Sequence, residues 1–260
     1  MALPFGRSAD FAFSKRGGEP CRNLLADDRC GIHHDLLTAG MSGCVRFDCF
    51  GAGQHVSQVL YGGRSWRQHP DPSMFDVFWT AQWLHELLWY AADVLDRDLP
   101  ESVLVAVAAQ ARSIRALVNR PPAEWSGRDG DEAWDRLKPL LARVSSMIRD
   151  DPAAVGTPPQ PDHSGVRLAG HDFRRADLRG ARLLGADLSG ADLREADLLG
   201  ADLRQTNLAG ADLRDALFLT QSQVNGAVGD ATTLLPATVH RPAHWAGRSP
   251  LAAPEPSARR

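Results

Sequence analysis

The chain has 260 residues, of which 43% are hydrophobic, and a formal net charge of −3. This near-neutral balance gives no reason to expect binding to nucleic acid or to a membrane surface, so we expect neither. No run approaches the roughly 18 apolar residues of a membrane span, and residues 1–16 lack the apolar core of a secretory signal, so we expect a cytoplasmic protein of two modest domains.

Residues 1–20 are polar and contain several glycines, which predicts a disordered N-terminus. The next segment, residues 21–70, contains every cysteine of the chain: Cys21, Cys30, Cys44 and Cys49. In a reducing cytoplasm, four closely spaced cysteines hold a metal more often than they pair as disulfides. Their spacing differs from that of a zinc finger, and four small buried thiols with no metal are the alternative.

The cysteine segment contains two short motifs, R-C-G-I-H at 29–33 and G-C-V-R-F at 43–47. They resemble motifs of the cysteine-cluster proteins of the YkgJ type, although the chain departs from that pattern at Val45 and in the long spacing from Cys30 to Cys44. The resemblance implies a zinc or iron–sulfur site held by the four cysteines. Three histidines are candidate substitute ligands: His33, His34 and His55.

Residues 71–149 have the periodicity of helices and predict a helical bundle. The first helix begins at Ser73 and carries an apolar side that includes Leu88 and Leu95. The second opens after Pro100 and ends before the two prolines at 121–122, and the third runs from about 129 to 149. The three helices have similar lengths and similar apolar stripes, which predicts an antiparallel three-helix bundle. An apolar stripe that the bundle leaves uncovered would support a homodimer.

Four aromatic residues of the first helix lie outside its apolar side: Trp79, Trp83, Trp89 and Tyr90. We expect them to pack in a core, with the lining of a pocket as the alternative. The pair His85-Glu86 is followed by Trp89 at the position where a zinc protease helix has its second histidine, which excludes that motif.

A proline-rich linker at 150–165 leads into a repeat of five residues at 166–220. Each pentad centres on Leu or Phe, usually with a small residue two positions earlier, with Asp or Asn one position earlier in eight of eleven pentads, and with Gly two positions later in six. A period of five fits neither a helix nor a flat strand, so the chain must turn a corner every five residues. The central residues are Leu168, Phe173, Leu178, Leu183, Leu188, Leu193, Leu198, Leu203, Leu208, Leu213 and Phe218.

The motif A-D-L-x-G, seen at 186–190, resembles the pentapeptide-repeat family. That resemblance implies a right-handed quadrilateral β-helix with four pentads per coil, in which the central and small residues point inward. The chain would then be of the α+β class, with a mixed N-terminal domain and its bundle followed by this solenoid. A narrow coil filled by one large apolar residue per side leaves no pocket for a substrate.

Sorting the pentads by fours predicts two distinct faces. One face stacks Asp172, Asp192 and Asp212 beside Arg174, Arg194 and Arg214. Another exposes a small apolar patch of Leu199, Leu217 and Leu219. We expect the charged face to contact a protein partner, and the apolar patch to contact either another protein surface or the protein's own helices. Residues 221–236 would cap the coil and residues 237–260 would form a disordered tail.

No catalytic set is recognisable, so the sequence favours a non-enzymatic interaction or scaffold protein. The family resemblance implies an alternative, the binding of a type II topoisomerase such as DNA gyrase by a rod that imitates DNA and protects against drugs. A rod of about 13 Å would need roughly eight negative charges to match DNA, whereas residues 166–215 have a net charge of −1. The third alternative is a zinc- or iron–sulfur-dependent activity in the cysteine segment.

Overall fold

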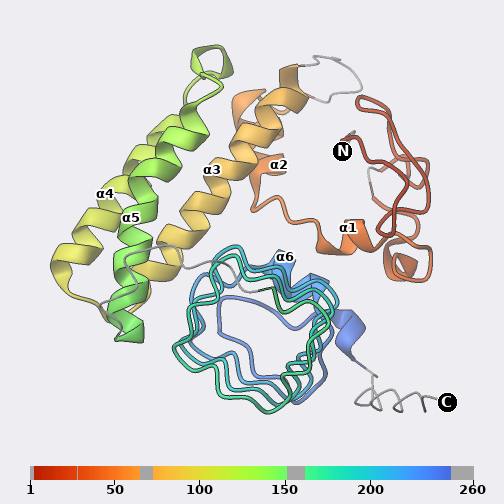
Figure 1. Ribbon diagram of the computed structural model, residues 1–260. Helices are drawn as coiled ribbons and strands as arrows, with labels where there is room; N and C mark the ends of the chain where they lie inside the picture. The colour runs from red at the N-terminus through yellow and green to blue at the C-terminus, as the bar shows by residue number, and fades with distance from the viewer. Residues whose placement is uncertain (1–2, 28, 65–72, 151–161, 247–260) are drawn as a thin grey trace. The chain divides into compact units, whose positions relative to one another are not determined.

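The structure is a computed structural model that describes residues 3–27, 29–64, 73–150 and 162–246. They divide into two compact units, Met1–Met147 and Ile148–Arg260. The first unit is mainly helical, and the second contains the five-residue repeat (Figure 1). Most of the predicted linker, at 151–161, and the end of the predicted tail, at 247–260, lie outside the described residues.

Residues 3–20 form a short antiparallel turn, which differs from the predicted disordered N-terminus. Phe5 and Lys15 exchange two backbone hydrogen bonds, of 3.1 and 2.7 Å. The ring of Phe5 stacks on Phe11 with 4.4 Å between centroids and meets Phe13 edge-on at 5.3 Å. Composition alone misses this turn because the three phenylalanines cover one another only after the chain reverses.

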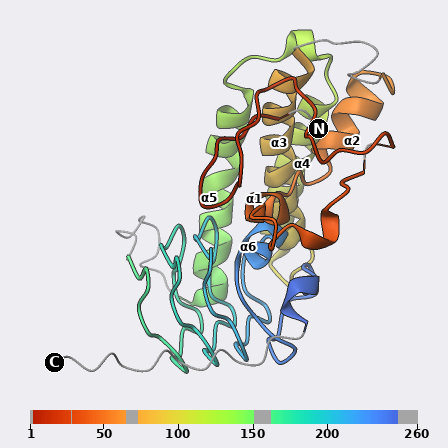
Figure 2. The same cartoon turned by 90° about the vertical axis from the view of Figure 1, so that its right-hand side faces the viewer.

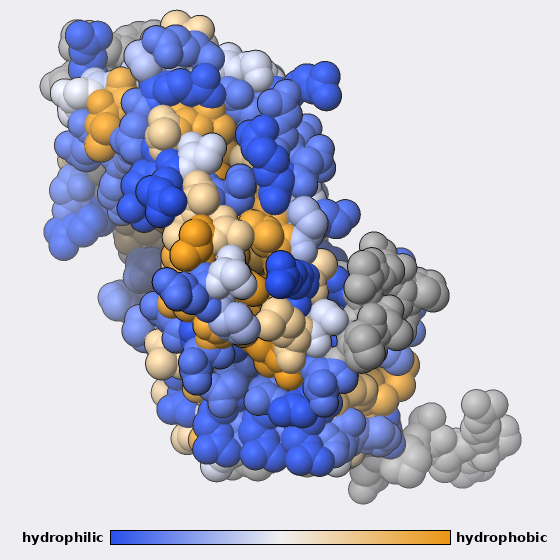
Figure 3. Space-filling view, turned by 90° about the vertical axis from the view of Figure 1, so that its left-hand side faces the viewer, coloured by the Kyte–Doolittle hydropathy of each residue, from blue (hydrophilic) through white to orange (hydrophobic). Residues whose placement is uncertain are grey.

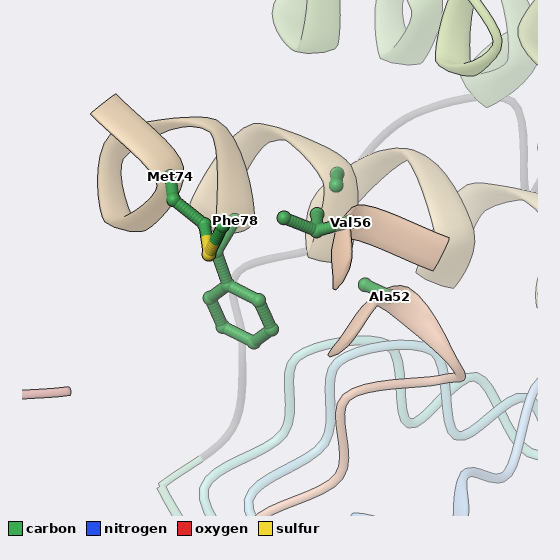
Figure 4. Packing of buried hydrophobic residues seen from close by; sticks show 5 residues of the cluster. Ala52, Val56, Met74 and Phe78 are labelled. Carbon is green, nitrogen blue, oxygen red and sulfur yellow. The ribbon is translucent and has the colours of Figure 1, made fainter. Parts of the chain in front are cut away.

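The cysteine segment forms four short helical turns: η1 (His33–Asp35), α1 (Ser42–Arg46), α2 (Ala52–Gln54) and η2 (His55–Leu60). The last two turns pack on the helix that follows them. Ala52 and Val56 contact Met74 and Phe78 in one buried apolar cluster (Figure 4). The cysteine segment is therefore held against the helical part of the first unit by hydrophobic burial of these side chains.

Three long helices follow, with the bounds that the sequence predicts: α3 (Ser73–Leu95), α4 (Glu101–Val118) and α5 (Asp129–Arg149). They pack together, and the rings of Trp83 and Trp134 lie 5.7 Å apart between α3 and α5. A side chain at Gly130 would come within 2.5 Å of the Trp83 ring, so only glycine fits at this close approach. A 3₁₀ turn, η3 (Pro122–Glu124), lies between α4 and α5.

The buried side of α3 is rotated from the predicted one. Leu87 and Val94 are buried, whereas Leu88 is half-buried and Leu95 is exposed. A helix with apolar and aromatic residues around most of its circumference offers two neighbouring stripes, and the packing of the whole unit selects one of them.

None of the described helices is long and apolar enough to cross a bilayer. Some large apolar side chains are exposed, including Val59, Trp79 and Val105. On the face that Figure 3 draws, hydrophobic residues are interspersed with hydrophilic ones. Such a mixture is ordinary for a protein surface.

The repeat winds into a coil with four pentads to each turn. Isolated parallel bridges join residues twenty positions apart, such as Arg167 to Asp187 and Asp187 to Asn207. The successive turns superpose on a four-sided outline in Figure 1 and stack as layers in Figure 2. The first bridge joins Asp162 to Arg182, so the coil begins four residues before the predicted start of the repeat.

The predicted side chains fill the centre of the coil. From Leu178 onward, every central leucine and Phe218 are at most 4% exposed, and from Ala181 onward the alanines that precede them are buried as well. Thr206 occupies one alanine position, where its hydroxyl donates to the Leu183 carbonyl at 2.7 Å and is therefore satisfied. Phe173, in the first turn of the coil, is half-buried.

Each corner is a tight turn closed by a backbone hydrogen bond, such as that from Ala191 N to Leu188 O at 3.0 Å. The third residue of the turn has a positive φ, for example +64° at Gly190. Glycine adopts this conformation without a steric penalty. Five pentads lack glycine there. In four of them the residue takes the same conformation, with φ between 58° and 61°: Arg175, Glu195, Gln205 and Asp215. In the last pentad, Thr220 has a φ of −102° and caps helix α6 (Gln221–Gly226).

Helix α6 (Gln221–Gly226) follows the last pentad directly. Thr220 and Gln223 form a capping box at its start. The Gln223 side chain also donates to the carbonyls of Leu198 and Ala201, at 2.8 and 2.9 Å. These bonds fix α6 on the end of the coil, where backbone carbonyls would otherwise lack partners.

Residues 237–246 continue the fold, which differs from the predicted disordered tail. The 3₁₀ turn η4 (Ala243–Trp245) places Trp245 in a buried position, and its Nε1 donates to the Ala227 carbonyl at 3.1 Å. A side chain at Gly229 would lie 2.5 Å from the Trp245 ring. The proline- and alanine-rich composition predicts disorder, but composition does not reveal that one large aromatic ring supplies the apolar area that orders this segment.

Replacing Gly190 with alanine tests the corner geometry. No atom lies within 4 Å of the added methyl group, so the cost comes only from the positive φ. We expect Gly190→Ala to lower the free energy of unfolding by about 1 kcal/mol, measured by chemical denaturation of the full chain. The matched change Gln205→Gly relieves the same strain and should stabilise the protein. Equal stability of the two variants would contradict the geometry.

Candidate functional site

The recurring aspartates and arginines of the repeat have a local structural role that the five-residue pattern did not predict. In each case the carboxylate before the central residue accepts a hydrogen bond from the backbone N–H two residues later, for example Arg174 N to Asp172 Oδ1 at 3.0 Å and Arg194 N to Asp192 Oδ1 at 3.2 Å. Asp and Asn favour this turn because their short side chains reach the backbone. The aspartates therefore stabilise the corners as well as giving the face its charge.

The arginines of the same face extend these bonds from one turn of the coil to the next. Arg174 lies 2.7 Å from Asp172 and 3.4 Å from Asp192, and Arg194 lies 2.6 Å from Asp192 and 3.7 Å from Asp212. We call this set the charged ladder: Asp172, Arg174, Asp192, Arg194, Asp212 and Arg214. The predicted columns of like charge are thus held together by alternating ion pairs.

The charged ladder borders a shallow groove of about 710 Å³. The second wall of the groove comes from three corner residues with positive φ: Arg175, Glu195 and Asp215. Arg175 pairs with Glu195 across one turn of the coil. These three residues were not predicted as part of the site. Their signal in the sequence is a charged residue at the glycine position of the pentad, on the same face as the ladder.

The predicted apolar patch is largely buried. Leu217 is 0% and Leu219 is 2% exposed, and Leu199 is half-buried. The pentad pattern identifies side chains that point out of the coil, but it cannot tell which of them are covered elsewhere in the fold. Burial is favourable because it removes two large apolar side chains from water.

The same face contains a buried ion cluster. Asp197 is 0% exposed and lies 3.5 Å from Arg179, which also pairs with Asp177. Arg149 lies 3.2 Å from Asp177 and donates to the Arg175 carbonyl at 2.8 Å. Buried charges persist when each has an opposite charge and further hydrogen bonds. This cluster is therefore structural, whereas the charged ladder is open to solvent.

The four predicted cysteine ligands are free thiols. Cys44 is an exposed residue, and partial desolvation of its thiol, with the charges of Cys21 and Cys30, raises its pKa. Cys49 instead packs beside the apolar cluster of α2 and α3. Within the described ranges, no three His, Cys, Asp or Glu side chains are arranged to hold a metal ion. A metal site of the four cysteines therefore stays a prediction.

The three histidines named as substitute ligands are in two different settings. The rings of His33 and His34 pack edge to face, 5.8 Å apart, in η1. The Nε2 atom of His55 lies 3.0 Å from the Val118 carbonyl. The described structure therefore engages His55 in a contact with the end of α4.

Comparison with known proteins identifies the repeat. A family model described as pentapeptide repeats, with eight copies, matches residues 164–194 and 182–218. A Bacillus subtilis (strain 168) protein named Uncharacterized protein YybG is 44% identical over 251 residues, which cover 94% of this chain and 90% of that protein. The chain belongs to the pentapeptide-repeat family. Because the similarity to YybG covers nearly the whole pentapeptide-repeat protein, it includes the helical first unit as well as the coil.

Hydrogen bonds set the protonation of the ladder. The side chain and the backbone N–H of Arg174 lower the pKa of Asp172 from its ordinary 3.8 to about 2. Hydrogen bonds from Arg194 and Arg214 likewise lower the pKa of Asp192 and of Asp212. The ladder of this pentapeptide-repeat protein is therefore fully ionised at neutral pH.

Titration of Asp172 tests these bonds. We expect its carboxyl to titrate near pH 2 by nuclear magnetic resonance, and Arg174→Gln to move the midpoint toward 3.8. Because the folded pKa is depressed, the stabilising contribution is complete above pH 3.8 and is lost as the pH falls toward 2. The control Arg204→Gln removes the same kind of pair, with Asp202, from another face. A wild-type midpoint near 3.8, or an equal response to both variants, would contradict the assignment.

Proposed function

We propose that this pentapeptide-repeat protein is a non-enzymatic scaffold that binds a partner protein through the charged ladder. The observation that carries the proposal is the filled interior of the coil. Leu188, Leu198 and Leu208 are 0% exposed, so the coil offers a substrate no internal cavity and only its outer faces can bind. Solenoids with filled cores generally act through such extended surfaces.

The hydrogen bonds of the ladder favour an acidic partner segment. Each ladder aspartate already accepts from a backbone N–H and from an arginine, as Asp192 does from Arg194. Arg194 and Arg214 donate to these aspartates through Nε and Nη2, so Nη1 takes no part in these pairs. Three such N–H edges, stacked at about 4.8 Å, suit the carboxylates of an acidic segment.

The proposal includes the finer features that the family resemblance implies. We infer a right-handed quadrilateral β-helix, which agrees with the twenty-residue spacing of the bridges and the four-sided outline in Figure 1. We also infer a cytoplasmic location, supported by four cysteines that are all unpaired thiols. Binding to DNA gyrase is less well supported because residues 166–215 are close to neutral, whereas a mimic of DNA must be strongly negative.

Binding should depend on Arg194 and not on Arg204. Both arginines pair with the aspartate two residues earlier, with Nη2–Oδ2 distances of 2.6 Å, and both are partly exposed, but they lie on different faces of the coil. We expect Arg194→Gln to weaken capture of a partner from a cell lysate by about fivefold, and Arg204→Gln to leave it unchanged. Quantitative mass spectrometry of the captured proteins is the measurement.

Experiments on the same purified protein distinguish the scaffold proposal from the alternative functions. Capture of gyrase subunits with inhibition of supercoiling would support topoisomerase binding, and a dimer that Arg194→Gln dissociates would make a second copy the partner. Metal bound to protein purified without oxygen would support the predicted site of Cys21, Cys30, Cys44 and Cys49. Turnover on a panel of metabolites, or equal capture by both arginine variants, would contradict the scaffold proposal.

A further inference from the structure

The backbone of the coil is left unpaired at the end where the coil begins. Within the coil, each turn bonds to the turn before it through the same groups: the Asp187 N–H donates to the Val166 carbonyl at 2.9 Å, and the Asp187 carbonyl accepts from the Leu168 N–H at 2.7 Å. The equivalent residues of the first turn, one on each side of the coil, have no earlier turn in the described chain: Asp162, Arg167, Asp172 and Asp177. We call these four residues the open positions, and the surface that they border the open end.

No described residue bonds to the backbone N–H or carbonyl of an open position. Arg149, which contacts the first turn at the Arg175 carbonyl and the Asp177 carboxylate, bonds to none of these backbone groups. The last turn differs, because Gln223 of α6 donates to backbone carbonyls of the coil there. The turns stack as layers in Figure 2, so the first turn is an uncovered β edge at one end of the stack.

The apolar core is also less covered at the open end. The central residues Leu168 and Phe173 are half-buried, whereas those one turn later are at most 1% exposed. Val166 and His171 occupy positions where the following turns have alanine, and both are exposed. The ring of His171 stacks on that of Phe173 with 6.1 Å between centroids. Larger side chains fit at alanine positions here because no further turn of the described coil packs against them.

The open positions have the hydrogen-bond pattern of an antiparallel ladder. At each of them the N–H and the carbonyl of one residue are both available, as the groups of Asp187 are to the turn before it. In an antiparallel ladder, two opposed residues of this kind exchange both of their bonds. Two identical coils that meet by the same end run in opposite directions around the contact, because a two-fold axis relates them. The open end is therefore complementary to itself.

A second coil suits this edge better than an extended segment of another protein. The edge turns a corner every five residues, as at Gly170 and Gly180 with φ of +69° and +60°, so a straight strand pairs with one side only. A second copy of the chain turns the same corners and pairs with all four sides. In the register of the coil, the residue that would donate to the Asp177 carbonyl is Pro158, which has no N–H.

Charge favours the same pairing. Arg167 is the single cation among the four open positions, and the other three are aspartates. Antiparallel pairing places Arg167 of each copy opposite an aspartate of the other copy in every register except the one that pairs it with itself. The aspartates that face each other are neutralised by arginines of their own chain: Arg174, Arg179 and Arg182.

The open end has about the area that a stable contact needs. Five residues at about 3.3 Å each make a side of about 16 Å, and the outward side chains widen the end to roughly 700 Å². A specific interface buries about 800 Å² on each partner. The end is therefore large enough for a dimer of moderate affinity.

We propose that two copies of this protein join through their open ends, so that the β ladder of one coil continues antiparallel into the other. The other end of each coil is covered by α6, so the assembly closes at two copies. The contact buries Val166, Leu168 and Phe173. It leaves Arg194 on the outer side of the charged ladder, and it differs from a dimer formed through the helices or through that ladder.

Sedimentation of the full chain over a range of concentrations measures this association. We expect a monomer–dimer equilibrium with a dissociation constant in the micromolar range. Val166→Asp should raise that constant at least about tenfold, because it places an unpaired charge in the contact. The matched control is Leu184→Asp, since Leu184 is equally exposed, at 39%, but lies one turn later and follows a central leucine. It should leave the dissociation constant unchanged.

Two further measurements locate the contact. Hydrogen exchange in the peptide at 162–178 should slow as the wild-type protein dimerises, and should not slow in Val166→Asp. Arg167→Glu, which leaves the apolar core intact, should weaken the dimer at least about threefold, and circular dichroism checks that each variant is folded. The proposal is wrong if the protein stays monomeric, or if the dimer forms without slower exchange at 162–178. It is equally wrong if Arg194→Gln dissociates the dimer, or if Val166→Asp and Leu184→Asp behave alike.

Discussion

The coil has room at its centre for one large apolar side chain and one alanine-sized side chain on each side, and the rest of the second unit follows from this limit. A buried leucine contributes about 2 kcal/mol, whereas an exposed ion pair contributes at most about 1 kcal/mol. The column from Leu178 to Leu213 therefore supplies most of the stability. The charged ladder, which includes Asp172 and Arg194, contributes less stability, and its charges distinguish its face of the coil from the other faces.

The same limit explains why charge serves two purposes on the outer surface. A corner every five residues requires a partner for its backbone N–H. Where an aspartate precedes the central residue, its carboxylate provides that partner, as Asp192 does for Arg194. Where the face is open to solvent, the paired arginine belongs to the surface that we propose binds a partner. Where the face is buried, as around Asp197, the same pair has a structural role. Burial, rather than the motif, separates the proposed binding face from the structural one.

Periodic features could be predicted from the sequence because they depend on neighbours a few residues away. The helix bounds near Pro100 and Pro121 and the repeat were correct for this reason. Features that depend on distant contacts were not, such as the burial of Leu217 and the order that Trp245 confers on the predicted tail. The contact between His85 and the Phe50 carbonyl also depends on residues that are distant in the sequence, because the two residues are 35 positions apart. No local pattern reveals that the two segments meet.

Thiol labelling of adjacent positions in one pentad tests most directly whether the central leucines fill the coil. The variants Leu193→Cys and Arg194→Cys differ only in the direction that the structure assigns to the side chain, inward and outward. Peptide mapping after brief exposure to a maleimide separates each new thiol from the four native ones. The account predicts that position 194 is modified at once in the folded protein and position 193 only after denaturation. Rapid modification of position 193 in folded protein would contradict the filled coil.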